Sequence, residues 1–167
     1  LHHQVAARGA APSQRARGLN ENYAREIMEL HTMGVGSGYT QADVEALARI
    51  LTGVGIDFKS EDPKLKPEQQ SQLVREGAFE FNPARHDFGD KAFLGHQIKG
   101  RGLAEVDEAL DILCHHPATA THIAKQLATY FVSDNPPPAL VQQMAQTFQK
   151  TDGDIAAVMS TRSEEHT

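Results

Sequence analysis

The sequence has little of what marks the specialised classes of protein. It contains one cysteine, Cys114, and no tryptophan, and aromatic residues make up 6% of its 167 residues. A single cysteine excludes an internal disulfide framework. No stretch approaches the roughly 18 consecutive apolar residues that a membrane-spanning helix requires. Neither a disulfide-stapled scaffold nor a membrane span is therefore encoded in these residues.

Positive charge is also scarce. The chain has 16 Lys and Arg against 22 Asp and Glu, a formal net charge of −6. Because a general nucleic-acid binder needs clustered cations for its phosphate contacts, this balance argues against nucleic acid as a partner. With 40% hydrophobic and 23% charged residues, the composition is that of one globular domain large enough to bury a core.

The first strong helical pattern follows Asn20, a favourable N-cap. It predicts a helix over residues 21–33, in which Tyr23, Ile27 and Leu30 recur at the i, i+4, i+7 spacing of a buried face. A second helix is predicted to open at a capping-box-like pattern after the glycine-rich loop and to end at Gly53. Its predicted buried stripe is Val44, Leu47, Ala48 and Leu51.

The second half of the chain is predicted to be helical from Leu103. The first of its helices ends near His115, Pro117 starts the next, and two more follow residues 136–138 and begin at Asp154. The predicted core positions of the first three are Leu103, Val106, Leu110, Leu113 and Cys114; then Ala120, Ile123, Ala124, Leu127, Ala128 and Phe131; then Leu140, Val141, Met144, Ala145 and Phe148.

Between the two helical regions, the apolar residues recur at every second position. Apolar residues alternate at Ile56, Phe58, Phe79 and Phe81, which predicts two strands with one buried face, paired as an antiparallel hairpin. The interval 60–77, rich in proline and charge, is predicted to be a mobile excursion, and a further extended piece is predicted at 91–94. The predicted fold class is mainly α with a small antiparallel β-hairpin (α+β) and bundle-like packing of the helices.

Both ends of the chain have a composition unlike that of the body. We expect residues 1–18 to be a linker or the end of an upstream region, and residues 19–161 to be the C-terminal part of one larger helical domain. Residues 162–167, Arg-Ser-Glu-Glu-His-Thr, resemble the translation of a DNA sequencing adapter. We expect them to be a non-native scar.

The first predicted helix offers one set of polar candidates. Arg25 and Glu29 are four residues apart, and Glu26 and His31 flank the predicted apolar stripe. Half-buried carboxylates and imidazoles can serve as metal ligands or as an acid/base pair. The alternative is an ordinary ion pair and a histidine at the last turn, since the spacing matches no specific metal motif.

The loop after the predicted hairpin offers a second set. His86 and Asp87 are neighbours, and Lys91 follows. A loop held by a hairpin is a common place for a site, and a histidine beside an aspartate suits proton transfer. In the structural alternative, Asp87 binds the backbone near Gly89 and Lys91 pairs with a carboxylate. Because adjacent side chains seldom meet, we expect a carboxylate partner of His86 to come from elsewhere, with Glu26 or Glu29 the nearest source.

The remaining candidates are weaker. His115 and His116 lie at a predicted helix end, where the dipole alone favours them, and His116 is kept as a catalytic candidate. Cys114 lies on an apolar stripe and is predicted to be core. The sequence has no phosphate loop, nucleophile elbow or paired CxxC, so it identifies no cofactor and no metal.

Several segments resemble a bacterial family in the same order along residues 18–161. They include Gly18 to Glu26, Glu29 to Thr32, Gly38 to Val44, Leu51 to Gly53, His86-Asp87, His116 to Ala120 and Thr151 to Asp154. The family is domain of unknown function 1800. Relatives commonly have Trp after Leu-Thr-Gly, where this chain has Val54.

The resemblance implies a mostly helical protein that is exported or associated with the cell envelope. It also implies, as a partner, another secreted protein encoded nearby, and it supplies no established reaction. Two functions remain open: a non-enzymatic helical module that binds a protein or an envelope component, and a metal-dependent or hydrolase-like enzyme. In the enzyme, the site would join the first helix to the His86 loop.

The Arg25–Glu29 pair generates a stability prediction. An arginine beside a buried stripe can use its planar fork for several acceptors at once, which lysine cannot do. We expect Arg25→Lys to lower the free energy of unfolding by more than the roughly 0.3 to 0.5 kcal/mol of an exposed helix pair. Chemical denaturation measures this, and an unchanged midpoint would show a solvated pair.

Overall fold

The computed structural model describes residues 13–164 of the chain, and the side chains of residues 20–161. The helices are α1 (Ser13–Glu26), α2 (Gln41–Ile50), α3 (Pro67–Gln70), α4 (Ala104–His115), α5 (Pro117–Phe131), α6 (Pro138–Lys150) and α7 (Ile155–Glu164), with a π-helical turn η1 (Ile27–His31) and a 3-10 turn η2 (Pro83–Arg85). The strands are β1 (Val54–Ile56), β2 (Val74–Glu76), β3 (Phe79–Phe81), β4 (Lys91–Phe93) and β5 (His96–Ile98). The fold is mainly α with small antiparallel sheets, as predicted. Residues 1–12 and 165–167, parts of the two expected terminal segments, lie outside the described residues.

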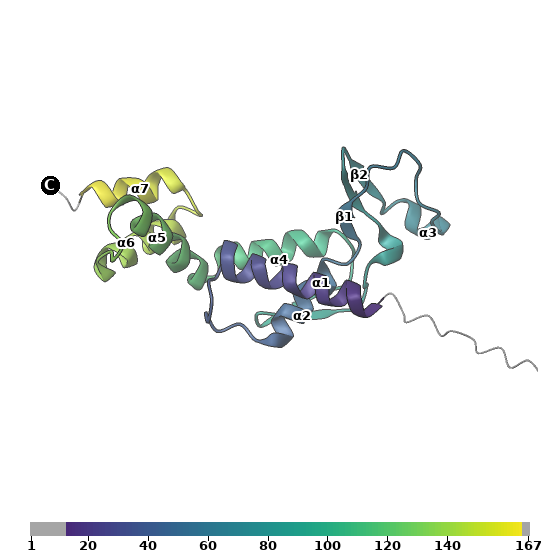
Figure 1. The fold of residues 1–167 in the computed structure, drawn as a ribbon, viewed down its shortest axis with the longest axis horizontal. Coiled ribbons are helices and arrows are strands. Elements are labelled where there is room, and N and C mark those ends of the chain that lie inside the picture. Colours follow the sequence, from purple (N-terminus) through teal and green to yellow (C-terminus); the bar gives the residue numbers. More distant parts are fainter. Residues whose placement is uncertain (1–12, 165–167) are drawn as a thin grey trace, which may run out of the picture.

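The buried residues form two hydrophobic clusters. The first lies among α1, α2, α4 and the β4–β5 hairpin, and the second lies among α5, α6 and α7. Figure 1 shows α5 to α7 at one end of the molecule, the three-stranded sheet at the other, and α1, α2 and α4 between them. His116 alone separates α4 from α5.

The first helix buries a different face from the predicted one. Ala24 and Met28 are fully buried, whereas Tyr23 and Leu30 are 60% and 54% exposed. Both pairs of positions suit a helical period, so spacing alone could not choose between them. The small Ala24 lies on the buried face, and the π-helical turn adds a residue per turn that shifts Leu30 away from it.

The second helix agrees with its prediction. Thr40 and Asp43 form a complete capping box, and the predicted stripe of Val44, Leu47, Ala48 and Leu51 is buried. Asp43 has a second use, because its Oδ1 accepts a hydrogen bond from the Leu94 backbone N–H at 2.8 Å. The N-terminal end of α2 is thereby tied to the β4–β5 turn.

The face of α4 was predicted correctly at Leu113 and in part at Val106, which packs against the core, but not at Leu110 and Cys114. Its buried residues are Glu105, Ala109 and Leu113, at i, i+4 and i+8. Leu110 is 40% exposed and Cys114 is also exposed, so the prediction that Cys114 is a core residue is wrong. The buried stripe includes the carboxylate of Glu105, which a pattern of apolar residues does not predict.

The second cluster follows the predicted positions closely. Ala120, Ala124 and Ala128 of α5 pack with Leu140, Met144 and Phe148 of α6. Phe131 is an exception at 52% exposed, because α5 ends there and the chain turns away towards α6.

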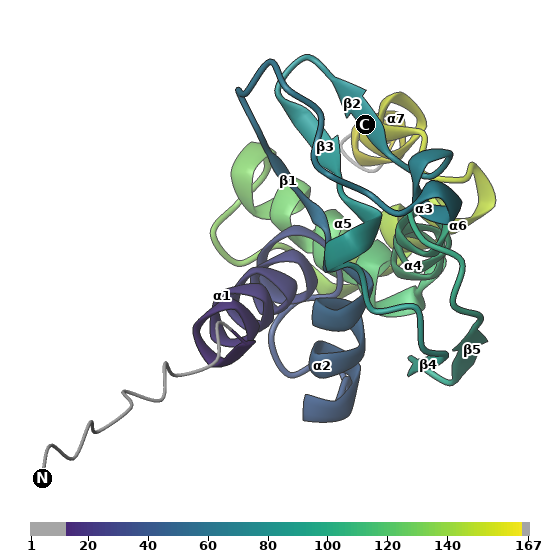
Figure 2. The same cartoon turned by 90° about the vertical axis from the view of Figure 1, so that its right-hand side faces the viewer.

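The predicted antiparallel pairing is present, but the two strands are not consecutive, because a third strand lies between them in the sequence. β1 pairs with β3 in the antiparallel register Val54↔Phe81 and Ile56↔Phe79. β2 comes from within the interval that was predicted to be an excursion, and it pairs with the other side of β3. Figure 2 shows the resulting order β1, β3, β2 across the sheet. The helix α3 also lies in this interval.

The apolar face of the sheet is only partly covered. Phe81 is fully buried, but Ile56 and Phe58 are 75% and 87% exposed, and Phe79 is 37% exposed. The prediction of one buried face is therefore wrong for three of its four residues. The sheet projects from the helices, so its base lies on the body of the protein and its tip does not (Figure 1).

Arg75 of β2 holds the interval between β1 and β2 in place. Its guanidinium donates to the Lys59 and Glu61 carbonyl oxygens and to the Asp62 carboxylate. Arg75 Nε also lies 3.3 Å from Glu80 Oε2, a buried oxygen with no aligned hydrogen-bond donor among the described residues. The positive charge of Arg75 compensates the negative charge of Glu80, and its hydrogen bonds hold the loop against the sheet.

We expect residues 60–72 to be less ordered than the strands. They lie outside the ladder of the sheet and are held mainly through Arg75. Their amides should therefore exchange with solvent faster than those of Phe79–Phe81. Native-state hydrogen exchange followed by NMR measures this, and equal protection of the two segments would contradict the prediction.

Candidate functional site

A buried group of charged side chains lies between the sheet and α4. The side chains of His86, Lys91 and Glu105 are 0% exposed. They come from the loop after η2, the first residue of β4 and the first turn of α4. We call these three residues the buried ionic cluster. Buried polar and charged groups need partners, and here Glu105 is the partner of both His86 and Lys91.

Glu105 is the centre of the buried ionic cluster. Its Oε2 accepts hydrogen bonds from His86 Nε2 at 2.7 Å and from the backbone N–H groups of Arg101 and Gly102 at 2.8 and 2.7 Å. Its Oε1 accepts a hydrogen bond from Lys91 Nζ. Burial alone raises the pKa of Glu105, but these donors outweigh burial and hold the pKa below its ordinary value. Glu105 is therefore a carboxylate.

Both ring nitrogens of His86 are occupied. Nδ1 lies 2.7 Å from the Thr52 carbonyl oxygen, and Nε2 lies 2.7 Å from Oε2 of the Glu105 carboxylate. Neither nitrogen is therefore available to another group. The rings of Phe81 and Phe88 lie edge-on to the His86 ring, with centroids 5.3 and 4.7 Å away. This packing fixes the orientation of the imidazole.

Asp87 faces the opposite way from His86. Its carboxylate accepts from Arg49 Nε at 2.8 Å and from the Gly89 backbone N–H at 2.9 Å, the backbone contact expected of the structural alternative. Its own backbone joins the interior, because the N–H donates to Thr52 Oγ1 and the carbonyl oxygen accepts from Lys91 Nζ. The hydrogen bond from Arg49 outweighs burial and lowers the pKa of Asp87 to about 2.

A polar cleft lies outside the buried ionic cluster, on the Asp87 side. It has a volume of about 560 Å³ and is lined by Asn20, Glu21, Glu45, Ala48, Arg49, Thr52 and Asp87. A smaller groove of about 240 Å³ shares Asn20 and Thr52 with it and follows β1. The cleft joins the first helix to the His86 loop, although His86 itself faces inward.

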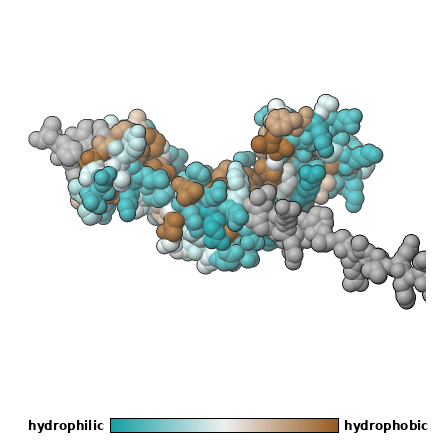
Figure 3. Space-filling model, viewed as in Figure 1, coloured by the Kyte–Doolittle hydropathy of each residue, from teal (hydrophilic) through white to brown (hydrophobic). Residues whose placement is uncertain are grey.

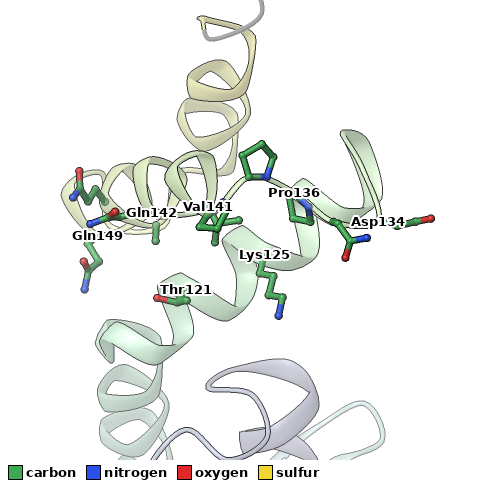
Figure 4. A pocket seen from close by; sticks show the side chains of 12 residues that line it. Thr121, Lys125, Asp134, Pro136, Val141, Gln142 and Gln149 are labelled. Carbon is green, nitrogen blue, oxygen red and sulfur yellow. The ribbon is translucent and has the colours of Figure 1, made fainter.

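The largest groove lies elsewhere, between α5 and α6. It has a volume of about 980 Å³. Figure 4 shows Thr121 and Lys125 from α5, Val141, Gln142 and Gln149 from α6, and Asp134 and Pro136 from the segment between them. None of the candidate residues that the sequence suggested lines this groove.

Arg25 and Glu29 connect the first helix to α2. Arg25 Nη1 lies 3.7 Å from Glu29 Oε1, and Arg25 Nη2 donates to Gln41 Oε1 at 2.7 Å. Glu29 also accepts a hydrogen bond from the Tyr39 hydroxyl. Burial and this hydrogen bond to Glu29 raise the pKa of Tyr39. Arg25 thus has two partners, one on its own helix and one on α2.

The other candidates do not meet at one place. Glu26 and His31 are both exposed. His116 is the N-cap of α5, where its Nδ1 accepts from the Ala118 backbone N–H at 3.1 Å. The carboxylate partner of His86 does come from elsewhere in the chain, but it is Glu105 from α4 and not Glu26 or Glu29.

Sequence reasoning missed the residues that complete the buried ionic cluster. Glu105 was overlooked, although a charged residue at the i, i+4, i+8 spacing of Ala109 and Leu113 is a signal that could have found it. Arg49 and Thr52 gave no such signal, because their role depends on a loop more than thirty residues later in the chain.

In the part of the chain that the structure describes, no group of three or more His, Cys, Asp or Glu residues is arranged to hold a metal ion. Among the same residues, no helix is long and apolar enough to cross a membrane.

Comparison with known proteins gives one match. A family model described as "Protein of unknown function (DUF1800)" matches residues 3–166. No curated protein and no solved structure is significantly similar to the chain.

The central position of Glu105 generates a prediction. Glu105→Gln leaves the buried Lys91 cation without its counter-charge and weakens the contact with the His86 ring, so we expect the free energy of unfolding to fall by roughly 3 to 5 kcal/mol. Urea denaturation at neutral pH measures the loss. Glu108→Gln is the matched control, because Glu108 lies on the same helix in a partly exposed pair with Arg101. The control should cost under about 1 kcal/mol. Equal effects of the two variants would contradict a central role for Glu105.

Proposed function

The chain belongs to the DUF1800 family, and from that premise we propose that it is a non-enzymatic helical module of an exported or envelope-associated protein, with a protein as its binding partner. The family description names no activity. Export is supported only by the resemblance of the sequence motifs. The binding role is supported by how the polar residues of those motifs are used.

One observation carries the proposal: two of the polar candidates, His86 and Lys91, are enclosed in the fold. Neither has exposed side-chain surface, and both are bonded to the buried Glu105. A general acid, base or nucleophile must reach a substrate atom directly or through one water molecule. The fully buried His86 ring has neither access to a substrate nor a free nitrogen. The cluster therefore suits a structural role.

Arg49 and Asp87, which line the polar cleft, suit ligand binding better than proton transfer. Asp87 is partly exposed but its pKa is about 2, so it stays ionised at neutral pH and holds no proton to donate. Arg49 is bonded to it through two nitrogens. A fixed, fully ionised pair can orient a ligand by hydrogen bonds, whereas acid/base catalysis needs a pKa near the working pH.

A binding experiment tests the proposal. The full-length protein, purified without chelator, is immobilised and exposed to the envelope extract of its source, and each captured protein is then produced in pure form. We expect at least one to rebind in calorimetry, saturably and with a Kd of about 10 μM or tighter.

Two results would overturn the proposal. The first is that no purified candidate rebinds. The second is that elemental analysis finds a metal at one equivalent that is lost in His31→Ala or His86→Gln, because this would favour the enzyme. His96→Gln is the control, since His96 belongs to β5 and to none of the candidate sets.

A further inference from the structure

The two hydrophobic clusters are joined at the junction of α4 and α5. His116 alone connects α4, which packs in the first cluster, with α5, which packs in the second. A short connection between two separately packed parts is the usual place of a hinge. On the face shown in Figure 3, the surface is hollowed between the end formed by α5 to α7 and the projecting sheet. The sheet therefore does not support that end on this face, and its orientation depends on contacts around the junction.

One of these contacts is an ion pair between the two clusters. His115 Nε2, on the last residue of α4, lies 2.6 Å from Asp152 Oδ1, in the turn between α6 and α7. Among residues 20–161, every other ion pair lies within the part of the chain that precedes α5. The pair lies in a groove of about 440 Å³, whose further lining residues are Cys114, Phe148, Gln149 and Gly153.

The turn that carries Asp152 is fixed to the second cluster. Asp152 has a positive φ of 55°, a conformation that aspartate adopts more readily than most residues. The Gly153 N–H donates to the Phe148 carbonyl oxygen at 2.8 Å and so closes the end of α6. Phe148 itself packs in the second cluster. A bond to Asp152 therefore holds the second cluster and not a loose loop.

Both nitrogens of the His115 ring have partners. Nδ1 lies 2.8 Å from the Asp111 carbonyl oxygen, one turn earlier on α4, and Nε2 faces the Asp152 carboxylate. Carbonyl and carboxylate oxygens only accept hydrogen bonds, whereas a neutral imidazole has one donor nitrogen. The two bonds therefore exist together only while the ring is protonated. Loss of the proton breaks either the bond to α4 or the bond to the second cluster.

The groups around His115 favour its protonated form. Its hydrogen bonds to the Asp111 carbonyl oxygen and to Asp152, together with the charges of both carboxylates, raise the pKa of His115 above its ordinary value. Its place at the C-terminal end of α4 acts in the same direction. The other titratable side chain of the groove is the thiol of Cys114. The link to Asp152 is therefore complete at acidic pH and is lost as the pH rises through this raised pKa.

We propose that the protonated His115 side chain fixes the orientation of α5 to α7 relative to the first cluster, and that the neutral side chain releases them to turn about His116. Other contacts keep the two parts together. Thr119 Oγ1 donates to the Leu113 carbonyl oxygen at 2.6 Å, and Ala118 packs against the first cluster. The change is therefore one of orientation and not a separation. It does not rest on the proposed binding role.

Residual dipolar couplings, measured by NMR on the unaltered 15N-labelled chain, test the inference. In one alignment medium, the couplings of α4 and α6 report how each cluster is oriented and how firmly the two are held together. At about pH 5.5, below the pKa of His115, we expect both to align as one body. At about pH 8.5, we expect the alignment of α5 to α7 to fall by at least about 1.5-fold relative to that of the first cluster, a modest change because the ion pair is exposed.

Two aspartates provide a matched pair of variants. Both raise the pKa of His115, but Asp111 lies on α4 itself and Asp152 lies beyond α6. We expect Asp152→Asn to show, at about pH 5.5, the reduced alignment that the unaltered chain shows at about pH 8.5. Asp111→Asn should lower the pKa of His115 and leave the alignment at the lower pH unchanged.

A variant of His115 separates it from the other histidines at the junction. His116 caps α5, and His122 Nε2 lies 3.4 Å from the Leu30 carbonyl oxygen. Because glutamine does not titrate, His115→Gln should make the alignment of the two clusters independent of pH. If this variant does not fold, the comparison of Asp152→Asn with Asp111→Asn still attributes the change.

Three results would overturn the inference. The first is an alignment that stays the same between the two pH values while the His115 ring titrates. The second is an equal effect of Asp152→Asn and Asp111→Asn on the alignment. The third is a pH-dependent alignment that persists in His115→Gln. None of them bears on the proposed function, because the experiment contains no partner.

Discussion

The carboxylate of Glu105 is the interaction on which the centre of the molecule depends. It accepts hydrogen bonds from the His86 loop, from Lys91 at the start of β4 and from two backbone amides before α4. The donors from His86, Lys91 and Gly102 are buried, and a buried donor without an acceptor costs more free energy than the bond gains. The His86 loop, β4 and the start of α4 must therefore be in place together. The cluster thus favours one arrangement of these three segments over others.

The constraint extends from the cluster to the surface of the protein. His86 donates to the Thr52 carbonyl oxygen at the end of α2, and Asp87 binds Arg49 on the outer side. At Gly100, a Cβ atom would lie 1.8 Å from the Phe88 carbonyl oxygen, so the His86 loop also requires a glycine opposite it. The walls of the polar cleft and the base of β1 are thus held by contacts inside the fold.

In the three-stranded sheet, one alternating pattern of apolar residues is buried at the base and exposed towards the tip. Val54 and Phe81 form one pair at its base, where Phe81 is fully buried, and Ile56 and Phe79 form the next pair towards the tip, where Ile56 is 75% exposed. The alternation is continuous along the strand, but the body of the protein covers only its first part. Apolar residues beyond that point add nothing to the core of the described part of the chain.

Local signals in the sequence determined the mainly α class, the capping box at Thr40, the stripe of α2 and the antiparallel pairing of Val54–Ile56 with Phe79–Phe81. These features depend on side chains a few residues apart or on strict alternation, and both can be recognised without coordinates. Only the tertiary structure decided that Ala24 and not Tyr23 is buried, that Cys114 is exposed, and that Glu105 is the partner of His86. The first reason is that the spacing of apolar residues in a helix fits more than one buried face. The second is that the burial of a charged residue depends on partners from distant parts of the chain, and these partners cannot be recognised from the local sequence.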